Sequence, residues 1–284
     1  MSLLVRDLIK MGETQLKKTG CPEPKTDAEA LYCFMREMDR NEFIMEWSET
    51  VEDKICDKYF DLVAERSMRR PIQHITGRQN IMGLDIGVRE DVLIPRMDTE
   101  TVILKADEII KTYKKPPSVL DMCCGSGVIG VVLAKRNSGI KLTMSDSSPA
   151  AKALAESNAR RYGIKTNVLL GDLFAPVKKK YDIIVSNPPY IPSDIIDTLE
   201  IEVKRFEPAE ALDGGPQGLD FFEKIAAEAP DHLKKEGCLI FETGHDQAAQ
   251  VRTIINATGV FGEPETERDL SGNNRVVWSR LKKQ

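Results

Sequence analysis

The sequence lacks the usual marks of secreted, metal-binding and membrane proteins. It has only six cysteines in 284 residues, with no C-x-x-C pair, and only three histidines, whose positions show no triad or metal spacing. No apolar run approaches the ~20 residues that span a bilayer. The first 20 residues carry Asp7, Lys10 and Glu13 among their apolar side chains, unlike a signal peptide. These absences predict no disulfide framework, no metal site, no membrane partner and a cytoplasmic location.

Acidic side chains slightly outnumber basic ones. Asp and Glu total 45 and Lys and Arg total 40, which gives a net charge of −5. A protein whose main partner is bare nucleic acid is usually basic, so we expect no direct nucleic-acid partner. The hydrophobic content of 41% is enough for a packed core, and the length fits one large or two modest domains.

Residues 1–72 show only helical patterns. Apolar residues recur at helical spacing, and Thr26 followed by Glu29 predicts a capping box at one helix start. We expect a small helical bundle without chemistry of its own, which docks a substrate protein. Residues 73–92 contain the alternating, glycine-containing stretch ITGRQNIMGLDIGV (75–88), which predicts a β-hairpin linker to the next domain.

Residues 93–284 change to alternating strand and helix patterns. Short β-branched runs predict strands, and helix-like segments such as 148–162 lie between most of them. This alternation predicts an α/β fold, in which helices cover both faces of a parallel sheet. The last two strands, around the turn SGNN, would add an antiparallel pair at one edge. The predicted strands are residues 118–124, 141–146, 167–172, 181–187, 237–243, 266–270 and 274–281.

The first of these strands leads into DMCCGSGVIG. Gly125 and Gly127 stand where strand turns into helix, and glycines there let the backbone approach a ligand. Asp146 ends the next strand, about 20 residues on, where nucleotide-binding sheets place an acid that binds ribose hydroxyls. Asp172 and Leu173 follow the third strand. Because the carboxyl ends of parallel strands share one edge, these residues predict an adenosine site.

The spacing of the glycine loop is D-x-C-x-G-x-G, not the G-x-G-x-x-G of dehydrogenases. It resembles the D/E-x-G-x-G-x-G loop of S-adenosylmethionine-dependent methyltransferases, with Cys123 in place of the first glycine. If this position needs a positive φ, a cysteine there is strained. We interpret Cys123 and Cys124 as small apolar fillers, not as a redox pair.

The fourth strand ends in VSNPPYIP. Two prolines cannot continue a central strand, since neither has a backbone N–H. The chain therefore stops beside the predicted adenosine site and presents Asn187, Pro188, Pro189 and Tyr190. The Asn187 oxygen and the Pro188 carbonyl can accept both N–H bonds of a planar NH₂ group, on which Tyr190 can stack. This pattern predicts methyl transfer to a planar nitrogen, where alignment matters more than a strong base.

Longer stretches point to one family. RPIQHITG (70–77), LIPRMDTE (93–100), NPPYIP (187–192), FEPAEALDGGPQGLDFF (206–222) and FETGHDQ (241–247) resemble the peptide chain release factor glutamine methyltransferases, the PrmC/HemK family. The resemblance implies a class I methyltransferase fold: a Rossmann-like, mostly parallel seven-stranded sheet, with a small N-terminal helical domain joined by a β-hairpin. It implies S-adenosyl-L-methionine as cofactor, S-adenosyl-L-homocysteine as product and release factors as protein substrates. The methyl acceptor would be the glutamine amide (N5) of their Gly-Gly-Gln motif.

The resemblance also gives site residues. Asn187, Pro188, Pro189 and Tyr190 would form the catalytic motif that holds the glutamine. The cofactor-binding residues would be Asp121, Cys123, Cys124, Gly125, Ser126, Gly127, Asp146, Asp172, Leu173 and Asn187.

Some residues and functions stay open. Arg96, Asp98 and Glu100 belong to a motif near the site, with Met97 where the family usually has proline, yet Asp98 could simply cap the next helix. Two acids, Glu207 and Glu242, suit a structural role. An alternative function is methylation of an exocyclic amine of a nucleic-acid base, although the net charge of −5 disfavours it. A catalytically weak adenosine-binding module is a further alternative, supported only by Cys123.

Overall fold

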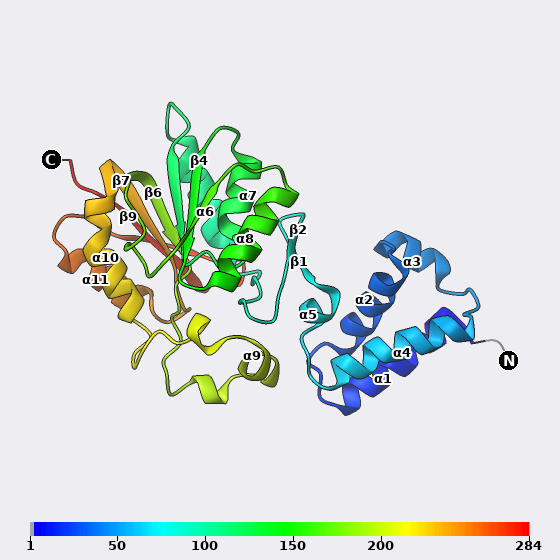
Figure 1. Cartoon of the computed structure of the whole chain (residues 1–284). Helices are drawn as coiled ribbons and strands as arrows, with labels where there is room; N and C mark the ends of the chain where they lie inside the picture. Colours follow the sequence, from blue (N-terminus) through cyan, green and yellow to red (C-terminus); the bar gives the residue numbers. More distant parts are fainter. Residues whose placement is uncertain (1–2, 284) are drawn as a thin grey trace. The chain divides into compact units, whose positions relative to one another are not determined.

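Helices build the first of two compact units in the computed structural model, which describes residues 3–283 (Figure 1). This unit comprises the chain up to Arg78 together with Glu200–Phe206. Leu8, Tyr32 and Tyr59 are almost completely buried in its core, so the predicted helical patterns are confirmed. The helices are α1 (Val5–Lys18), α2 (Pro24–Arg36), α3 (Arg40–Glu46), α4 (Asp53–Ser67), α5 (Ile72–Thr76) and α9 (Ile201–Phe206).

The predicted capping box at Thr26 is wrong. Helix α2 begins earlier, at Pro24, because a proline at the first helical position already has the φ that a helix requires. Thr26 therefore lies inside the first turn. A capping box is present instead at α3, where Asp39 Oδ1 accepts from Glu42 N at 2.9 Å and Glu42 Oε2 accepts from Asp39 N at 2.8 Å.

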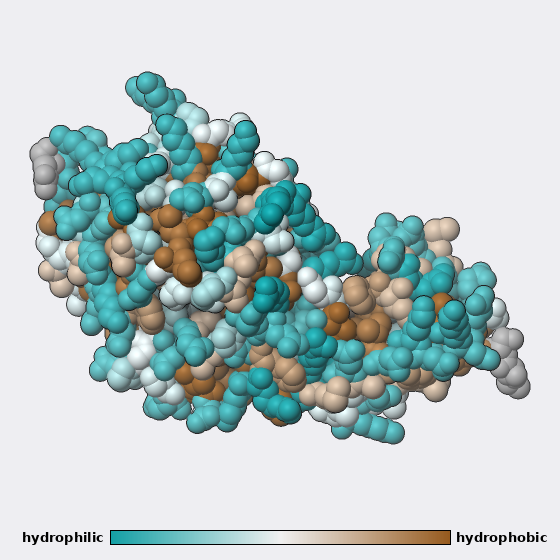
Figure 2. Space-filling view, in the orientation of Figure 1, coloured by the Kyte–Doolittle hydropathy of each residue, from teal (hydrophilic) through white to brown (hydrophobic). Residues whose placement is uncertain are grey.

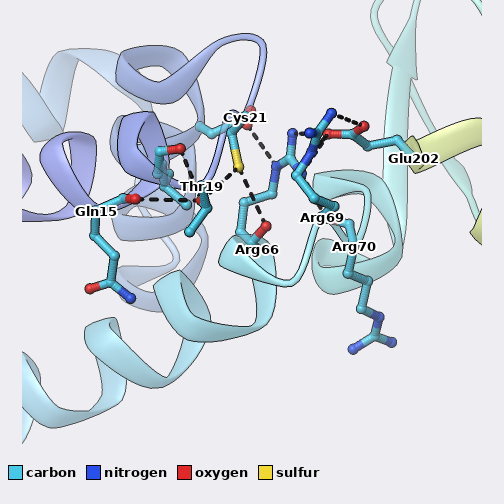
Figure 3. Close-up of polar contacts among 9 residues, drawn as sticks. Gln15, Thr19, Cys21, Arg66, Arg69, Arg70 and Glu202 are labelled. Atoms are coloured by element: carbon cyan, nitrogen blue, oxygen red, sulfur yellow. Dashed lines mark hydrogen bonds and ion pairs between the residues drawn. The ribbon is translucent and has the colours of Figure 1, made fainter. Parts of the chain in front are cut away.

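A network of buried charges holds the short helix α9 within this unit (Figure 3). Arg66 on α4 donates from Nε to Asp27 at 2.7 Å and from both Nη atoms to Glu202 at 3.0 Å. Arg69 Nε donates to the same Glu202 oxygen at 2.7 Å. Nothing in the sequence pattern indicated this grouping, because residues 200–206 follow the fourth predicted strand along the chain.

The second unit contains Gln79–Leu199 and the chain from Glu207 onward. The predicted hairpin is confirmed, since strands β1 (Arg78–Ile81) and β2 (Leu84–Gly87) form a two-stranded sheet. The main sheet has seven strands in the order β5-β4-β3-β6-β7-β9-β8. Its strands are β3 (Ser118–Met122), β4 (Lys141–Asp146), β5 (Asn167–Leu170), β6 (Tyr181–Ser186), β7 (Leu233–Glu242), β8 (Glu265–Arg268) and β9 (Asn274–Arg280).

The main sheet is parallel except at one edge. Strand β3 pairs in parallel with both β4 and β6, and β6 pairs in parallel with β7. Strand β9 is antiparallel to both β7 and β8. The predicted α/β fold, with all seven strands and the antiparallel edge, is confirmed. Because β4 and β6 lie on opposite sides of β3, the carboxyl ends of these strands border a switch point, where open α/β sheets bind ligands.

Helices cover both faces of this sheet (Figure 1). Ile183 and Val185 of β6 face the apolar cluster that includes α6, α7 and α8, whereas Ile184 faces the cluster that includes α10 and α11. This alternation explains why the strand is apolar at nearly every position. The helical elements of this unit are α6 (Thr99–Lys111), α7 (Val128–Arg136), α8 (Pro149–Arg161), α10 (Asp220–His232), α11 (Ala248–Ala257) and the short 3₁₀ turns η1 (Ile196–Thr198) and η2 (Ala209–Ala211).

The face of the molecule drawn in Figure 2 is mainly hydrophilic, with several separate apolar areas. Exposed large apolar side chains include Ile44, Met45 and Met97. Among residues 3–283, none of the helices combines the length and apolar character needed to cross a membrane.

Candidate active site

A cavity of about 450 Å³ lies at the carboxyl ends of β3, β4, β5 and β6 in the second unit. This is the edge of the sheet at which the sequence predicts adenosine binding. The cavity is lined by Asp91, Val92, Leu93, Met122, Cys123, Gly125, Ser145, Asp146, Ser147, Ser148, Ala150, Ala151, Gly171, Asp172, Leu173, Asn187, Pro189, Pro208, Glu210, Ala211 and Phe221.

The loop between β3 and α7 needs left-handed backbone at several positions. Gly125 and Gly127 have φ values of +53° and +77°. At Gly127 a Cβ would lie only 3.0 Å from the Ala155 Cβ and the Met144 sulfur, so the loop packs closely only with glycine. Cys123 also has a positive φ, +56°, which costs a non-glycine residue about 1–2 kcal/mol. The strain expected if a cysteine stood at such a position is therefore present.

Asp146 connects the ends of two strands at the cavity wall. Its Oδ2 accepts from Gly125 N at 2.8 Å, and its Oδ1 accepts from Ser148 N at 2.9 Å. Burial raises the pKa of this carboxyl, while the hydrogen bonds from Ser148 and Gly125 oppose the rise. The side chain thus shapes the glycine loop besides facing the cavity.

Asp121 lies behind the cavity wall. It is completely buried, and its Oδ2 accepts from Gly130 N at 2.8 Å at the first turn of α7. Its Oδ1 has no hydrogen-bond partner among the described residues. Burial, and to a lesser extent the Asp146 charge, raise the pKa of Asp121 to about 7. Asp121 therefore fixes α7 beneath the loop.

The predicted cofactor residues divide into two groups. Those that line the cavity are Cys123, Gly125, Asp146, Asp172, Leu173 and Asn187. The others, Asp121, Cys124, Ser126 and Gly127, stand outside the lining. A role of this second group in cofactor binding stays a prediction, and their contacts indicate that they shape the loop.

The Asn-Pro-Pro-Tyr motif follows β6 directly. Asn187 and Pro189 line the cavity, while Pro188 is buried beside them. Tyr190 packs against the apolar cluster on the α10 face, and burial raises the pKa of its hydroxyl to about 12. Its carbonyl accepts from Gln247 Nε2 at 2.8 Å, which anchors the end of the motif.

Two glycines of LDGGPQG pack against this motif. A Cβ on Gly214 would lie 2.8 Å from the Pro189 oxygen and from Tyr190 Cα. A Cβ on Gly218 would collide with the Tyr190 carbonyl oxygen. Only glycine therefore fits at either position, so this distant stretch can pack directly against the Asn-Pro-Pro-Tyr backbone.

The LIPRMDTE stretch forms polar contacts around the site. Arg96 Nη2 donates to Glu207 Oε1 at 2.5 Å. Glu100 Oε1 accepts from Met82 N at 3.1 Å, next to the hairpin turn. Asp98 stands at the position before α6 but makes no side-chain cap, so the capping alternative is wrong. Its carboxylate instead pairs with Arg275 Nη2 at 2.9 Å, because α6 packs against β9.

Sequence reasoning missed several lining residues. Asp91 and Val92 lie just after the hairpin, and Glu210 and Phe221 lie after β6. Glu210 and Phe221 fall within FEPAEALDGGPQGLDFF (206–222). This stretch resembles a family motif, but the resemblance did not show which of its residues would line the cavity. Asp91 and Val92 had no such signal, because their position depends on how the preceding hairpin packs against α8.

The charge of the cavity is one-sided. Its described lining contains four carboxylates, Asp91, Asp146, Asp172 and Glu210, and no Lys, Arg or His. Such a site suits a cationic ligand and opposes the phosphate groups of common nucleotides. No group of three or more His, Cys, Asp or Glu side chains within residues 3–283 could hold a metal ion.

Two family models match the sequence. The model described as "Methyltransferase small domain" matches residues 96–204, and that described as "PrmC N-terminal domain" matches residues 7–77. The first match includes β3 to β6 with the Asn-Pro-Pro-Tyr motif. The second coincides with the helices α1 to α5.

Curated relatives match over nearly the whole chain. A release factor glutamine methyltransferase of Geobacter sulfurreducens is 36% identical over 278 residues, covering 98% of this chain and 96% of that protein. One of Clostridium botulinum is 34% identical over 283 residues, covering 98% and 99%. Among solved structures, a methyltransferase from Pyrococcus furiosus superposes with a TM-score of 0.53 at 18% identity, over 72% of this chain and 91% of that chain. This last likeness concerns the fold alone.

Proposed function

The chain belongs to the release factor glutamine methyltransferase family, and we propose that it transfers a methyl group from S-adenosylmethionine to a release factor. The accepting atom is the side-chain amide nitrogen (N5) of the glutamine in the Gly-Gly-Gln motif. The observation that carries the proposal is the position of Asn187 on the wall of an acidic cavity at the switch point of the sheet.

The cavity fits this cofactor by charge. S-adenosylmethionine supplies an electrophilic methyl group on a positively charged sulfur, and it also carries an ammonium group. Four carboxylates without an opposing cation favour such a ligand and disfavour phosphate-bearing cofactors. We assign Asp146 to the ribose hydroxyls, because it stands at the end of β4, beside the glycine loop. Leu173 supplies an apolar wall for the adenine.

The Asn-Pro-Pro-Tyr motif orients the substrate amide. An amide nitrogen is a weak nucleophile, since its lone pair is delocalised over the carbonyl. The Asn187 oxygen and the Pro188 carbonyl accept its two N–H bonds and hold the nitrogen in line with the methyl group. The stiff prolines fix the second acceptor before the substrate arrives. No strong base is needed, because the N–H proton of the substrate amide becomes acidic only after the methyl group has been transferred to the nitrogen.

We assign docking of the release factor to the helical unit, within which residues 7–77 match the PrmC N-terminal domain. Because release factors act in translation, we also propose that the protein works in the cytoplasm and needs no direct nucleic-acid or membrane partner.

Transfer of label tests this function. The full chain is incubated with cofactor carrying a tritiated methyl group and a purified release factor, beside tRNA and DNA. Label should enter the release factor and not the nucleic acids. A release factor with Gly-Gly-Ala in place of Gly-Gly-Gln should remain unlabelled. Labelling of tRNA or DNA would favour the exocyclic-amine alternative.

A further inference from the structure

Glu242, the last residue of β7, carries a deeply buried carboxyl group. The residue is completely buried, and neither oxygen has a hydrogen-bond partner of ordinary geometry among the described residues. A buried carboxyl without partners is costly, so its presence calls for an explanation.

The position of Glu242 is set by the pairing of β6 and β7. These strands are parallel, with Ser186 opposite Phe241. The next residues along the two strands are therefore Asn187 and Glu242. Asn187 lines the cavity, whereas Glu242 lies outside the lining. The side chains of Thr99 and Asn187 approach the carboxyl closely enough to oppose the effect of burial, which raises the pKa of Glu242 to about 7.

The charged side chains near Glu242 form ion pairs with other residues. Arg275 of β9 pairs with Asp98 at 2.9 Å and with Asp269 at 3.3 Å, and it donates to the Thr243 carbonyl. The Arg275 charge lowers the pKa of Glu242 and the Asp98 charge raises it. Arg96, two residues before Asp98 in the chain, is paired with Glu207.

The charge of Glu242 also affects Tyr190 of the Asn-Pro-Pro-Tyr motif. Its charge is the second cause, after burial, of the raised pKa of Tyr190. Among the side chains in residues 3–283 that are named above as acting on the pKa of Glu242, only that of Asn187 also lines the cavity.

We infer that Glu242 is a positioning residue for methyl transfer, which accepts a hydrogen bond from the Asn187 amide and turns the Asn187 oxygen toward the cavity. This inference rests on the proposed function. The Asn187 amide has one end that donates and one that accepts, and the two ends have nearly the same shape. An ionised carboxylate only accepts, so it selects the orientation with Nδ2 toward Glu242 and Oδ1 toward the substrate.

The same contact acts on the rate more than on binding. As the substrate nitrogen attacks, its N–H groups become more positive. An Asn187 oxygen polarised by a carboxylate behind it becomes a stronger acceptor at that moment. The interaction therefore strengthens in the transition state, and its loss should reduce turnover while cofactor affinity stays the same.

Single-turnover transfer in Glu242→Gln tests the inference. Gln keeps the volume but can present a donor to Asn187, so both amide orientations become possible. At a pH of about 8, transfer to the release factor should slow on the order of tenfold to a hundredfold, with an unchanged cofactor Kd. Asp107→Asn is the matched control, because Asp107 is a buried carboxylate at the far end of α6 that binds Lys111, Arg136 and Asn137. It should leave the rate unchanged.

The pH profile separates positioning from a structural role. Ionised Glu242 is the productive form, so the rate of the parent should rise with pH through about 7 and then level off. Glu242→Gln should lose the part of this rise that comes from Glu242, while any part that comes from Asp121 remains. A parent rate that falls with rising pH, or a Glu242→Gln variant with the parent rate and profile, would overturn the inference.

A measurement that does not depend on methyl transfer tests the role of Glu242 separately from the proposed function. The side-chain NH₂ signal of Asn187, assigned by its absence in Asn187→Ala, is followed by NMR across the same pH range. It should titrate near pH 7 in the parent and not in Glu242→Gln. If the Asn187 signal still titrates near pH 7 in Glu242→Gln, the inference is wrong even if release factors are methylated. Titration of the parent signal without any labelling of release factors would instead count against the proposed function alone.

Discussion

Arg66 and Glu202 are joined by two hydrogen bonds of 3.0 Å, although 136 residues separate them in the sequence. Burial would raise the pKa of Glu202, but hydrogen bonds from Arg69 and Arg66 lower it overall. Both partners are therefore charged at neutral pH.

Removing one partner should therefore be costly. We expect Glu202→Ala to lower the free energy of unfolding by roughly 3–5 kcal/mol, because Arg66 stays buried with part of its charge unpaired. Hydrogen exchange in residues 200–206 should also become faster. The control is Glu200→Ala, an exposed acid of the same segment, which should change stability by less than about 0.5 kcal/mol. Equal stability of the two variants in urea unfolding would contradict the importance of the network.

Asp146→Ala should weaken cofactor binding. Loss of a hydrogen bond to a charged group costs about 1.5–3 kcal/mol, so Kd should rise on the order of tenfold to a hundredfold. Isothermal titration calorimetry with S-adenosylmethionine measures this change. Because Asp146 also binds Gly125 N and Ser148 N, the melting temperature of the variant should be recorded beside Kd. Unchanged affinity would remove Asp146 from the cofactor site.

Cys123→Gly should be tolerated and should bind cofactor at least as well as the parent. Glycine relieves about 1–2 kcal/mol of strain at φ +56°, while its greater freedom in the unfolded chain returns about 0.5–1 kcal/mol. Cys124→Gly is the matched control. Cys124 is buried and is not among the residues with positive φ, so its variant should only lose packing and stability. Loss of cofactor binding in Cys123→Gly would reveal a role for the thiol.

Asn187→Ala should bind cofactor normally and lose most methyl transfer. Removing one preorganised polar contact of this kind reduces the rate on the order of 10²–10³. Asn187→Asp keeps the size and an acceptor but adds a charge beside a cationic sulfur. That charge favours the cofactor before transfer and opposes the loss of positive charge during it, so we expect retained binding and slower transfer. Single-turnover assays give the rates, and parent-like transfer by Asn187→Ala would refute the amide clamp.

Asp121 should make the protein less stable as pH rises from about 4 to about 7. In the folded chain burial raises its pKa to about 7, whereas an unfolded aspartate titrates near 3.8. The folded state binds more protons in this window, so the free energy of unfolding falls with rising pH, by at most about 1.4 kcal/mol per pH unit for one group. Asp121→Asn should show a shallower fall in urea unfolding. An unchanged slope would mean that Asp121 is ionised in the folded protein.

The sequence by itself determined the order of the elements and the chemistry of the site. Strands and helices could be predicted because their apolar periodicity is local, as in the nearly continuous apolar run of β6. Gly125, Gly127 and the two prolines of the Asn-Pro-Pro-Tyr motif could be recognised because their backbone requirements depend on few neighbours. These local features, with the family motifs, were enough to indicate the fold and a site at the carboxyl edge of the sheet.

The tertiary structure decided which distant residues meet. Glu202 joins the helical unit through its ion pairs with Arg66 and Arg69, which lie more than 130 residues earlier in the chain. Glu242 stands beside Asn187 only because β6 and β7 pair in one parallel register. The four carboxylates of the cavity come from separate segments, so its charge could be counted only after folding. Contacts of this kind depend on register and packing between remote elements, which local periodicity does not encode.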